Sequence, residues 1–313
     1  MTISPLPPPS DSAPPAAARA RRLATARGEF AVVDMPSDDG AEPKGVVLML
    51  PGFTGSKEDF RLVHAPLAAR GYRTVAVDGR GQYESEGPDD EAAYAQTELA
   101  RDVLAQAEAL GTPVHLVGHS LGGLIARAAV LLDASPFRSL TLIASGPGRI
   151  SVSQEQRVKL LRDALAVMSM EQCWEAILAM GPPEEVGGPA RGIGGQEQLR
   201  RRWLGTRPAQ LLATGRQLLA EPDRVAELAA VSLPFHVLSG ARDDTWPVPD
   251  LDAMAVRLRA HRTVVAGAEH SPTVDQPLPT ARALAAFWDT LADGDGAGSG
   301  AGSGAGAGPG PGR

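Results

Sequence analysis

Short apolar runs alternate with longer segments of helical period along most of the chain. The runs are continuously apolar, which is typical of strands that are buried on both faces. They occupy residues 45–50, 73–78, 114–118, 139–144, 235–240 and 262–267. The segments of helical period lie at residues 57–70, 91–110, 121–133, 250–260 and 278–291. This alternation predicts an α/β fold in which helices cover both faces of a mainly parallel sheet.

The alternation is interrupted after residue 144, and no convincing strand follows until about residue 234. Helical patterns occur there instead, at residues 158–168, 170–180 and 208–220, with Gly- and Pro-rich breaks at residues 181–195. A loop of this length without secondary structure would be unusual in a compact domain. We therefore predict a helical insertion over residues 147–231 that lies over the sheet.

The two ends of the chain differ in composition from this core. Residues 1–27 are rich in Pro, Ala and Ser, and residues 293–313 consist almost entirely of Gly, Ala, Ser and Pro. Such segments bury too little apolar surface to offset the entropy lost on ordering. We expect two disordered tails around a core made of residues 28–146 and 232–292.

Composition and charge exclude several classes of function. The 313 residues are 43% hydrophobic and 21% charged, which is ordinary for a chain that buries a sizeable core. The formal net charge is -7, and the basic residues are scattered apart from a short arginine group at residues 19–27. A nucleic-acid partner would need a cluster of Lys and Arg, so we expect none. The single cysteine, Cys173, excludes an internal disulfide and a Cys-rich metal site.

Neither a secretory signal nor a membrane span is predicted. Residues 1–22 lack the continuous apolar stretch of about 7 to 15 residues that a signal peptide needs, and no run reaches the roughly 18 apolar residues of a span. We expect a cytoplasmic protein that acts on a small molecule, without a metal or organic cofactor. The sequence leaves the oligomeric state open.

The strongest chemical motif is G-H-S-L-G at residues 118–122, between an apolar run and a helical segment. The pattern G-x-S-x-G forms a nucleophile elbow in this strand, turn and helix context. A tight turn would hold Ser120 in a strained conformation, and side chains in place of Gly118 or Gly122 would collide with backbone. The following helix would direct its N-terminal N–H groups toward a developing oxyanion.

A serine hydroxyl needs a base and an orienting acid. Of the six histidines, His270 alone lies in a loop between the last apolar run and the last helix. Asp243 and Asp244 follow the preceding run, and we favour Asp243 because it lies three residues after Gly240. Of the other histidines, we expect structural roles for His115 and His236, which lie in strands. We expect His64 and His261 to be exposed on helices and His119 to pack within the elbow.

Two backbone N–H groups are candidates for an oxyanion hole. One is that of Leu121, directly after the serine. The other is that of Phe53, in the segment P-G-F-T-G that follows the first predicted strand. The segment D-G-R-G at residues 78–81, together with Ser85, is expected to fix loops near the site without taking part in the chemistry.

These motifs together resemble the α/β-hydrolase superfamily, specifically its esterase, lipase and peptidase members with G-H-S-x-G-G. The resemblance covers about residues 29–292 and implies a mainly parallel sheet of about eight strands with a helical cap. The order Ser120, Asp243, His270 is the order of triads in this superfamily. Two departures are Pro51-Gly52, where many relatives have His-Gly, and R-G-Q-Y-E-S at residues 80–85, where R-G-x-G-x-S is usual. Ser rather than Asp at position 120 argues against dehalogenase and epoxide hydrolase chemistry.

The resemblance implies a two-step acyl transfer, with a carboxylic ester of small or medium size as the preferred substrate. Residues of the insertion could form an apolar acyl pocket, namely Met168, Met170, Trp174, Met180 and Trp203. The alternatives that use the same triad are a thioesterase, a proline-releasing aminopeptidase and a carbon–carbon bond hydrolase. A non-catalytic protein that binds a ligand in a hydrolase pocket would not need all three groups.

Overall fold

A computed structural model describes residues 17–38, 42–111, 113–179 and 195–296. Eight strands form one sheet in the order β1-β2-β4-β3-β5-β6-β7-β8. The strands β1 and β2 pair antiparallel, as do β2 and β4, and all other pairs are parallel. The strands are Arg19–Thr25, Gly28–Met35, Gly45–Leu50, Tyr72–Val77, Val114–His119, Phe137–Ile143, Phe235–Gly240 and His261–Val265, β1 to β8 in chain order. The predicted α/β fold with a mainly parallel sheet of about eight strands is confirmed.

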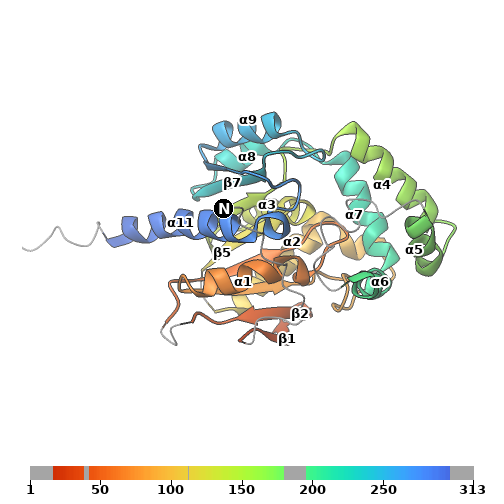
Figure 1. The fold of residues 1–313 in the computed structure, drawn as a ribbon, viewed down its shortest axis with the longest axis horizontal. Coiled ribbons are helices and arrows are strands. Elements are labelled where there is room, and N and C mark those ends of the chain that lie inside the picture. Colours follow the sequence, from red (N-terminus) through yellow and green to blue (C-terminus); the bar gives the residue numbers. More distant parts are fainter. Residues whose placement is uncertain (1–16, 39–41, 112, 180–194, 297–313) are drawn as a thin grey trace, which may run out of the picture.

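Helices cover both faces of the sheet, as Figure 1 shows. On one face α2, α3, α8 and α9 share a core with alternate strand residues such as Leu48. On the other face α1 and α11 pack on the intervening residues, such as Val47 and Met49. Burial of successive residues on opposite faces explains why these strands are continuously apolar. The helices are Arg61–Ala68 (α1), Gln96–Ala109 (α2), Leu121–Leu132 (α3), Val225–Ala229 (α8), Val248–Leu258 (α9), Pro272–Asp275 (α10) and Pro277–Gly296 (α11), with 3-10 turns at Lys57–Phe60 and Glu91–Tyr94.

The predicted boundaries of the core need two corrections. The prediction that residues 1–27 form a disordered tail is wrong for β1, which is paired with β2 along its whole length. Only Leu23 of β1 is buried, so ladder hydrogen bonds and ion pairs such as Arg21–Asp34, rather than apolar burial, hold this edge strand. At the other end α11 continues to Gly296, past the predicted end of the core at residue 292.

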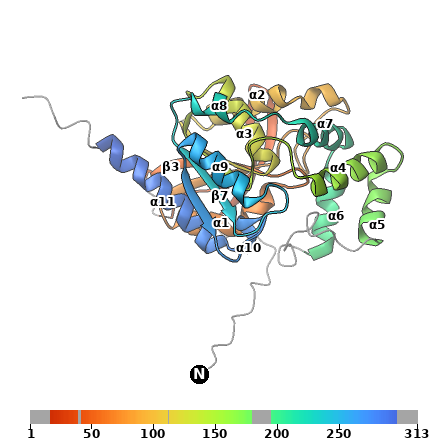
Figure 2. The same ribbon diagram turned by 90° about the horizontal axis from the view of Figure 1, so that it is seen from above.

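The insertion between β6 and β7 contains α4 to α7, which stand together at one end of the molecule in Figures 1 and 2. All four helices contribute to a small core of their own, which includes Cys173 and Trp203. Helix α8 packs on α3 and α9, and its residue Val225 belongs to the main core, so the insertion ends as a packing unit at α7. Helices α4 to α7 are Val152–Leu165, Met170–Ala179, Gly195–Gly205 and Pro208–Ala220.

None of the helices in the described ranges combines the length and the apolar composition that a membrane crossing requires. Residue 180 and most of the predicted Gly- and Pro-rich breaks at residues 181–195 lie outside the described residues.

Candidate active site

The turn between β5 and α3 places Ser120 at the carboxyl end of the sheet. Its backbone has φ 53 and ψ -121, a conformation that L residues rarely adopt. A Cβ atom on Gly118 would lie 2.4 Å from the carbonyl oxygen of Gly122, and one on Gly122 would lie 2.5 Å from the carbonyl oxygens of Leu50 and Pro51. The two glycines are therefore required by close backbone approach, as predicted from the sequence.

Three side chains from separate loops meet at this turn. Ser120 Oγ lies 3.1 Å from His270 Nε2, and His270 Nδ1 lies 3.0 Å from Asp243 Oδ1. The Asp243 side chain is fully buried, whereas that of His270 is 20% exposed. With the proton on Nδ1 donated to Asp243, the Nε2 lone pair faces the serine hydroxyl and can accept its proton.

The two candidate acids in the loop after β7 differ in their burial and in their hydrogen-bond partners. Asp243 Oδ1 also accepts hydrogen bonds from the N–H groups of Thr245 (2.9 Å) and Trp246 (3.1 Å), which fix the carboxylate toward His270. The side chain of Asp244 is 59% exposed and accepts a hydrogen bond from Gln154 of α4 at 2.8 Å. The geometry therefore favours Asp243 as the partner of the histidine.

Both candidate oxyanion donors lie beside Ser120. Leu121 is the first residue of α3, so its N–H has no acceptor within the helix. A Cβ atom on Gly52 would lie 3.3 Å from Ser120 Cβ, which shows that the peptide joining Gly52 to Phe53 passes close to the serine. None of the backbone hydrogen bonds of the described residues uses the Phe53 N–H.

His119 has a role that sequence reasoning missed. Its Nε2–H donates to the backbone carbonyl of His270 at 2.8 Å, and the two rings lie 5.2 Å apart. Burial, with the neighbouring His270 as a lesser cause, lowers the pKa of His119 to about 4, so the ring is neutral. The packing role expected for His119 thus includes a hydrogen bond that holds the loop of His270. Its position next to Ser120 was the available signal.

Other histidines serve the core. His115 Nδ1 and His236 Nε2 bond the hydroxyls of Ser139 (2.8 Å) and Thr263 (2.9 Å), in agreement with the structural role expected for them. The expectation of solvent exposure for His64 was wrong, because the side chain is fully buried and bonds a threonine hydroxyl of β4. No group of three or more His, Cys, Asp or Glu side chains within the described ranges is placed to hold a metal ion.

The D-G-R-G segment ties the loop after β3 to the end of β4. The buried carboxylate of Asp78 accepts hydrogen bonds from the Lys57 backbone N–H at 2.7 Å and from Lys57 Nζ at 2.8 Å. Burial alone would lower the pKa of the Lys57 ammonium, but Asp78 and Glu84 outweigh it and hold that pKa above its ordinary value. Ser85 Oγ donates to the Asp78 carbonyl at 2.7 Å. These contacts match the loop-fixing role expected for Asp78 and Ser85.

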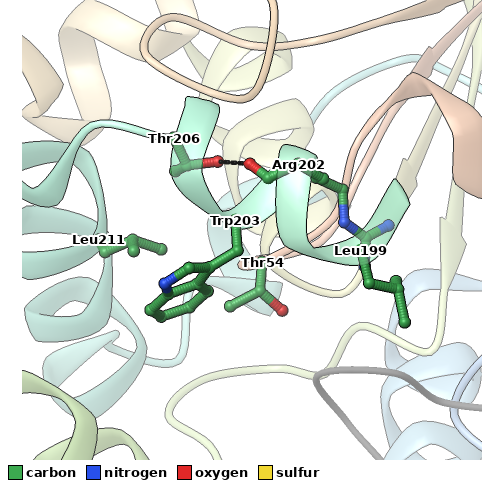
Figure 3. A pocket seen from close by; sticks show the side chains of 6 residues that line it. All are labelled: Thr54, Leu199, Arg202, Trp203, Thr206 and Leu211. Atoms are coloured by element: carbon green, nitrogen blue, oxygen red, sulfur yellow. Dashed lines mark hydrogen bonds between the residues drawn. The ribbon is translucent and has the colours of Figure 1, made fainter. Parts of the chain in front are cut away.

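A pocket lies between the loop after β3 and the insertion, as Figure 3 shows. Its lining residues are Thr54 from the loop, Leu199, Arg202 and Trp203 from α6, Thr206 directly after α6, and Leu211 from α7. Of the residues predicted to form an acyl pocket, Trp203 lines it, with its indole N–H bonded to the Met170 carbonyl at 2.7 Å. Met168 and Trp174 pack in the core of the insertion and do not line this pocket, and Met180 lies outside the described residues.

Solved structures share this fold at low identity. The enol-lactonase from Burkholderia xenovorans aligns with a TM-score of 0.69 at 17% identity, over 86% of this chain and all (100%) of that one. An esterase from Thermogutta terrifontis aligns with a TM-score of 0.69 at 20% identity, over 87% of this chain and 99% of that one. Identities in this range establish the fold alone.

Sequence comparisons are more specific. The pimeloyl-[acyl-carrier protein] methyl ester esterase of Aeromonas hydrophila is 32% identical over 222 residues, which span 68% of this chain and 83% of the relative. The protein of the same name from Edwardsiella ictaluri is 28% identical over 80% of this chain and 95% of the relative. The model of the alpha/beta hydrolase family matches residues 47–283. The chain therefore belongs to the alpha/beta hydrolase family.

Proposed function

We propose that this protein is a serine hydrolase that cleaves a carboxylic ester of small or medium size through an acyl-enzyme intermediate. The observation that carries the proposal is the pair of contacts made by the imidazole of His270. Its Nε2 lies 3.1 Å from Ser120 Oγ, and its Nδ1 lies 3.0 Å from the buried carboxylate of Asp243. A hydroxyl with a positioned base is an activated nucleophile.

In the first half of the reaction, His270 takes the Ser120 proton as Oγ attacks the ester carbonyl carbon. The N–H groups of Phe53 and Leu121 stabilise the oxyanion of the tetrahedral intermediate. The imidazolium is stabilised by Asp243, and it gives its proton to the departing alcohol. In the second half, His270 activates a water molecule that attacks the acyl-enzyme, and the acid is released as Ser120 regains its proton.

The choice of an ester rests on the relatives and on the pocket. Relatives that match most of their own length are named as methyl ester esterases, and they support ester cleavage by this chain. The pocket adjoins Thr54, next to the proposed oxyanion donor Phe53, and its wall is apolar at Leu199, Trp203 and Leu211. We propose that the apolar end of the substrate lies against this wall. The cytoplasmic location expected from the sequence stays a prediction.

The test compares hydrolysis of p-nitrophenyl esters of increasing acyl length by the wild type, Ser120→Ala and Ser139→Ala. Ser139 is a matched control, because it is a buried serine that bonds a histidine, His115, away from the site. We expect Ser120→Ala to lose hydrolysis and fluorophosphonate labelling while Ser139→Ala keeps both. Wild type that is folded but inactive and unlabelled would rule out the proposal. Parallel assays with a thioester and a prolyl anilide separate the thioesterase and aminopeptidase alternatives.

A further inference from the structure

The side chain of Gln82 holds the peptide unit that carries the proposed oxyanion donor. We propose that Gln82 is a positioning residue for the Phe53 N–H, an inference that rests on the proposed function. Gln82 lies in the turn after β4, and its side chain is buried, with the residue 6% exposed. Its amide nitrogen donates to the carbonyl oxygen of Gly52 at 3.0 Å.

The direction of one end of a peptide unit sets the direction of the other. The carbonyl of Gly52 and the N–H of Phe53 belong to the same planar trans unit, so they point in opposite directions. Gln82 Nε2 and the Gly55 N–H, at 3.2 Å, both bind the Gly52 oxygen. With the Phe53 N–H directed toward the serine, as proposed, this oxygen faces the other way, and fixing it there keeps the N–H in place. Donors on the carbonyl also polarise the unit, which strengthens its N–H as a donor.

This peptide needs support from a neighbour because Gly52 lacks a side chain. A Cβ atom there would lie 3.3 Å from both Ser120 Cβ and His119 Nδ1, so a larger residue would crowd the elbow. Glycine gives the close approach but leaves the backbone free to rotate. Gln82 adds a side-chain restraint to the one that the Gly55 N–H supplies.

A glutamine suits this position because both halves of its amide are used. While Nε2 donates to Gly52, Oε1 accepts the Gly79 N–H at 3.0 Å, and only this orientation of the amide satisfies both partners. The turn is closed by the Gln82 N–H on the Gly79 carbonyl at 2.9 Å. The next residue, Tyr83, has φ 40 where the resemblance has glycine, and its N–H donates to Thr206 of the insertion at 3.2 Å. Gln82 is thus held from both sides.

The test uses the full chain with p-nitrophenyl butyrate and, as a probe of oxyanion binding, an alkyl trifluoromethyl ketone. Gln82→Leu removes the donor, and Gln82→Glu keeps the shape and the acceptor for Gly79 but presents an oxygen to the Gly52 carbonyl. We expect kcat to fall about 10-fold to 100-fold in both variants, since loss of a whole oxyanion donor costs about 100-fold to 1,000-fold. KM should change less than about twofold, because ground-state binding does not use this N–H.

Affinity for the ketone should fall by the same factor as kcat, a coupling that a purely structural role would not produce. Gln106→Leu is the matched control, because Gln106 is a buried glutamine of α2, and it should keep kcat and ketone affinity. Equal kcat in wild type and Gln82→Leu, or a fall in kcat without weaker ketone binding, would overturn the inference and leave the proposed function standing. An inactive wild type would overturn both. If Gln82→Leu does not fold, Gln82→Glu alone decides.

Discussion

At the scale of single residues, the site depends on short polar contacts that fix the nucleophile, the base and the acid relative to one another. Ser120 and His270 stand in motifs with a recognisable context, and their contact in the structure is short, with Oγ and Nε2 3.1 Å apart. The choice between Asp243 and Asp244 needs the burial of each carboxylate. His119 and Gln82 bind backbone carbonyls of other loops. The position of His119 beside Ser120 indicates that it lies near the site, but the sequence does not identify the carbonyl that either side chain binds.

Replacement of Asp243 by Asn should lower kcat by about 1,000-fold to 10,000-fold, because the amide no longer favours the proton on His270 Nδ1. Asp244→Asn is the matched control, and its exposed side chain leads us to expect a change of less than about twofold. Steady-state kinetics with one ester give kcat for both variants and so distinguish the two candidate acids. A larger loss in Asp244→Asn than in Asp243→Asn would reverse the assignment of the acid.

His119→Phe should keep the ring volume but remove the hydrogen bond to the His270 carbonyl. Because a shift of about 1 Å in a catalytic group can cost roughly 100-fold, we expect kcat to fall about 10-fold to 100-fold. His115→Phe, which changes a buried histidine of the same strand away from the site, should lose stability but keep kcat. Rates measured beside melting curves distinguish the two effects, and an unchanged kcat in His119→Phe would show that the hydrogen bond is dispensable.

At the scale of elements, the apolar runs predicted β3 to β8 to within a few residues, because burial on both faces leaves a strong hydrophobic signal. The edge strand β1 was missed since it buries only Leu23, and its antiparallel partner β2 was not identified as a strand. The insertion was predicted from helical period alone. The attachment of the insertion to the core depends on buried polar contacts between residues distant in sequence, and the helical period of the sequence does not reveal these contacts.

One such contact joins the two ends of the insertion to α3. Arg127 donates to Glu221 Oε1 at 2.7 Å and to the Pro147 carbonyl at 2.7 Å, and both charged side chains are almost fully buried. Arg127→Met would leave the Glu221 carboxylate buried without its cation, so we expect a loss of about 3–5 kcal/mol in unfolding free energy. Urea denaturation measures it. The double variant Arg127→Met/Glu221→Met should lose less than Arg127→Met, and an equal or larger loss would contradict this account.

At the scale of the whole molecule, the fold and the family were predictable from the sequence. The alternation of apolar runs with helical segments indicated the fold, and the motifs around Ser120, Asp243 and His270 indicated the family. The lining of the pocket was not predictable. Met168 and Trp174 pack in the core of the insertion, and among the predicted residues that the structure describes only Trp203 lines the pocket. The helical period shows which face of a helix is apolar. It does not show which apolar surface that face covers.

Stability of the whole domain should fall in mild acid. Burial lowers the pKa of several histidines to about 4, so below the ordinary value of about 6.5 the unfolded chain binds more protons than the folded one. Stability is thus full above pH 6.5 and decreases as the pH falls toward 4, by up to about 2 kcal/mol per histidine at pH 5. The histidines concerned are His64, His115 and His119, together with His236, whose pKa burial lowers to about 3.

Urea denaturation at pH 7.5 and pH 5 tests this dependence. His64→Gln should flatten it, while the exposed His261 changed to Gln should leave it as in the wild type. An equal loss of unfolding free energy between pH 7.5 and pH 5 in all three proteins would mean that the buried histidines do not control acid stability.

Detection of the acyl-enzyme itself would show directly whether Ser120 is the nucleophile. Wild-type protein is mixed with p-nitrophenyl butyrate, quenched in acid within the first turnover and digested for mass spectrometry. We expect a burst of p-nitrophenol and a butyryl group on the peptide that contains Ser120. A burst-free reaction with butyrate on another residue, or hydrolysis that persists in Ser120→Ala, would contradict this role of Ser120.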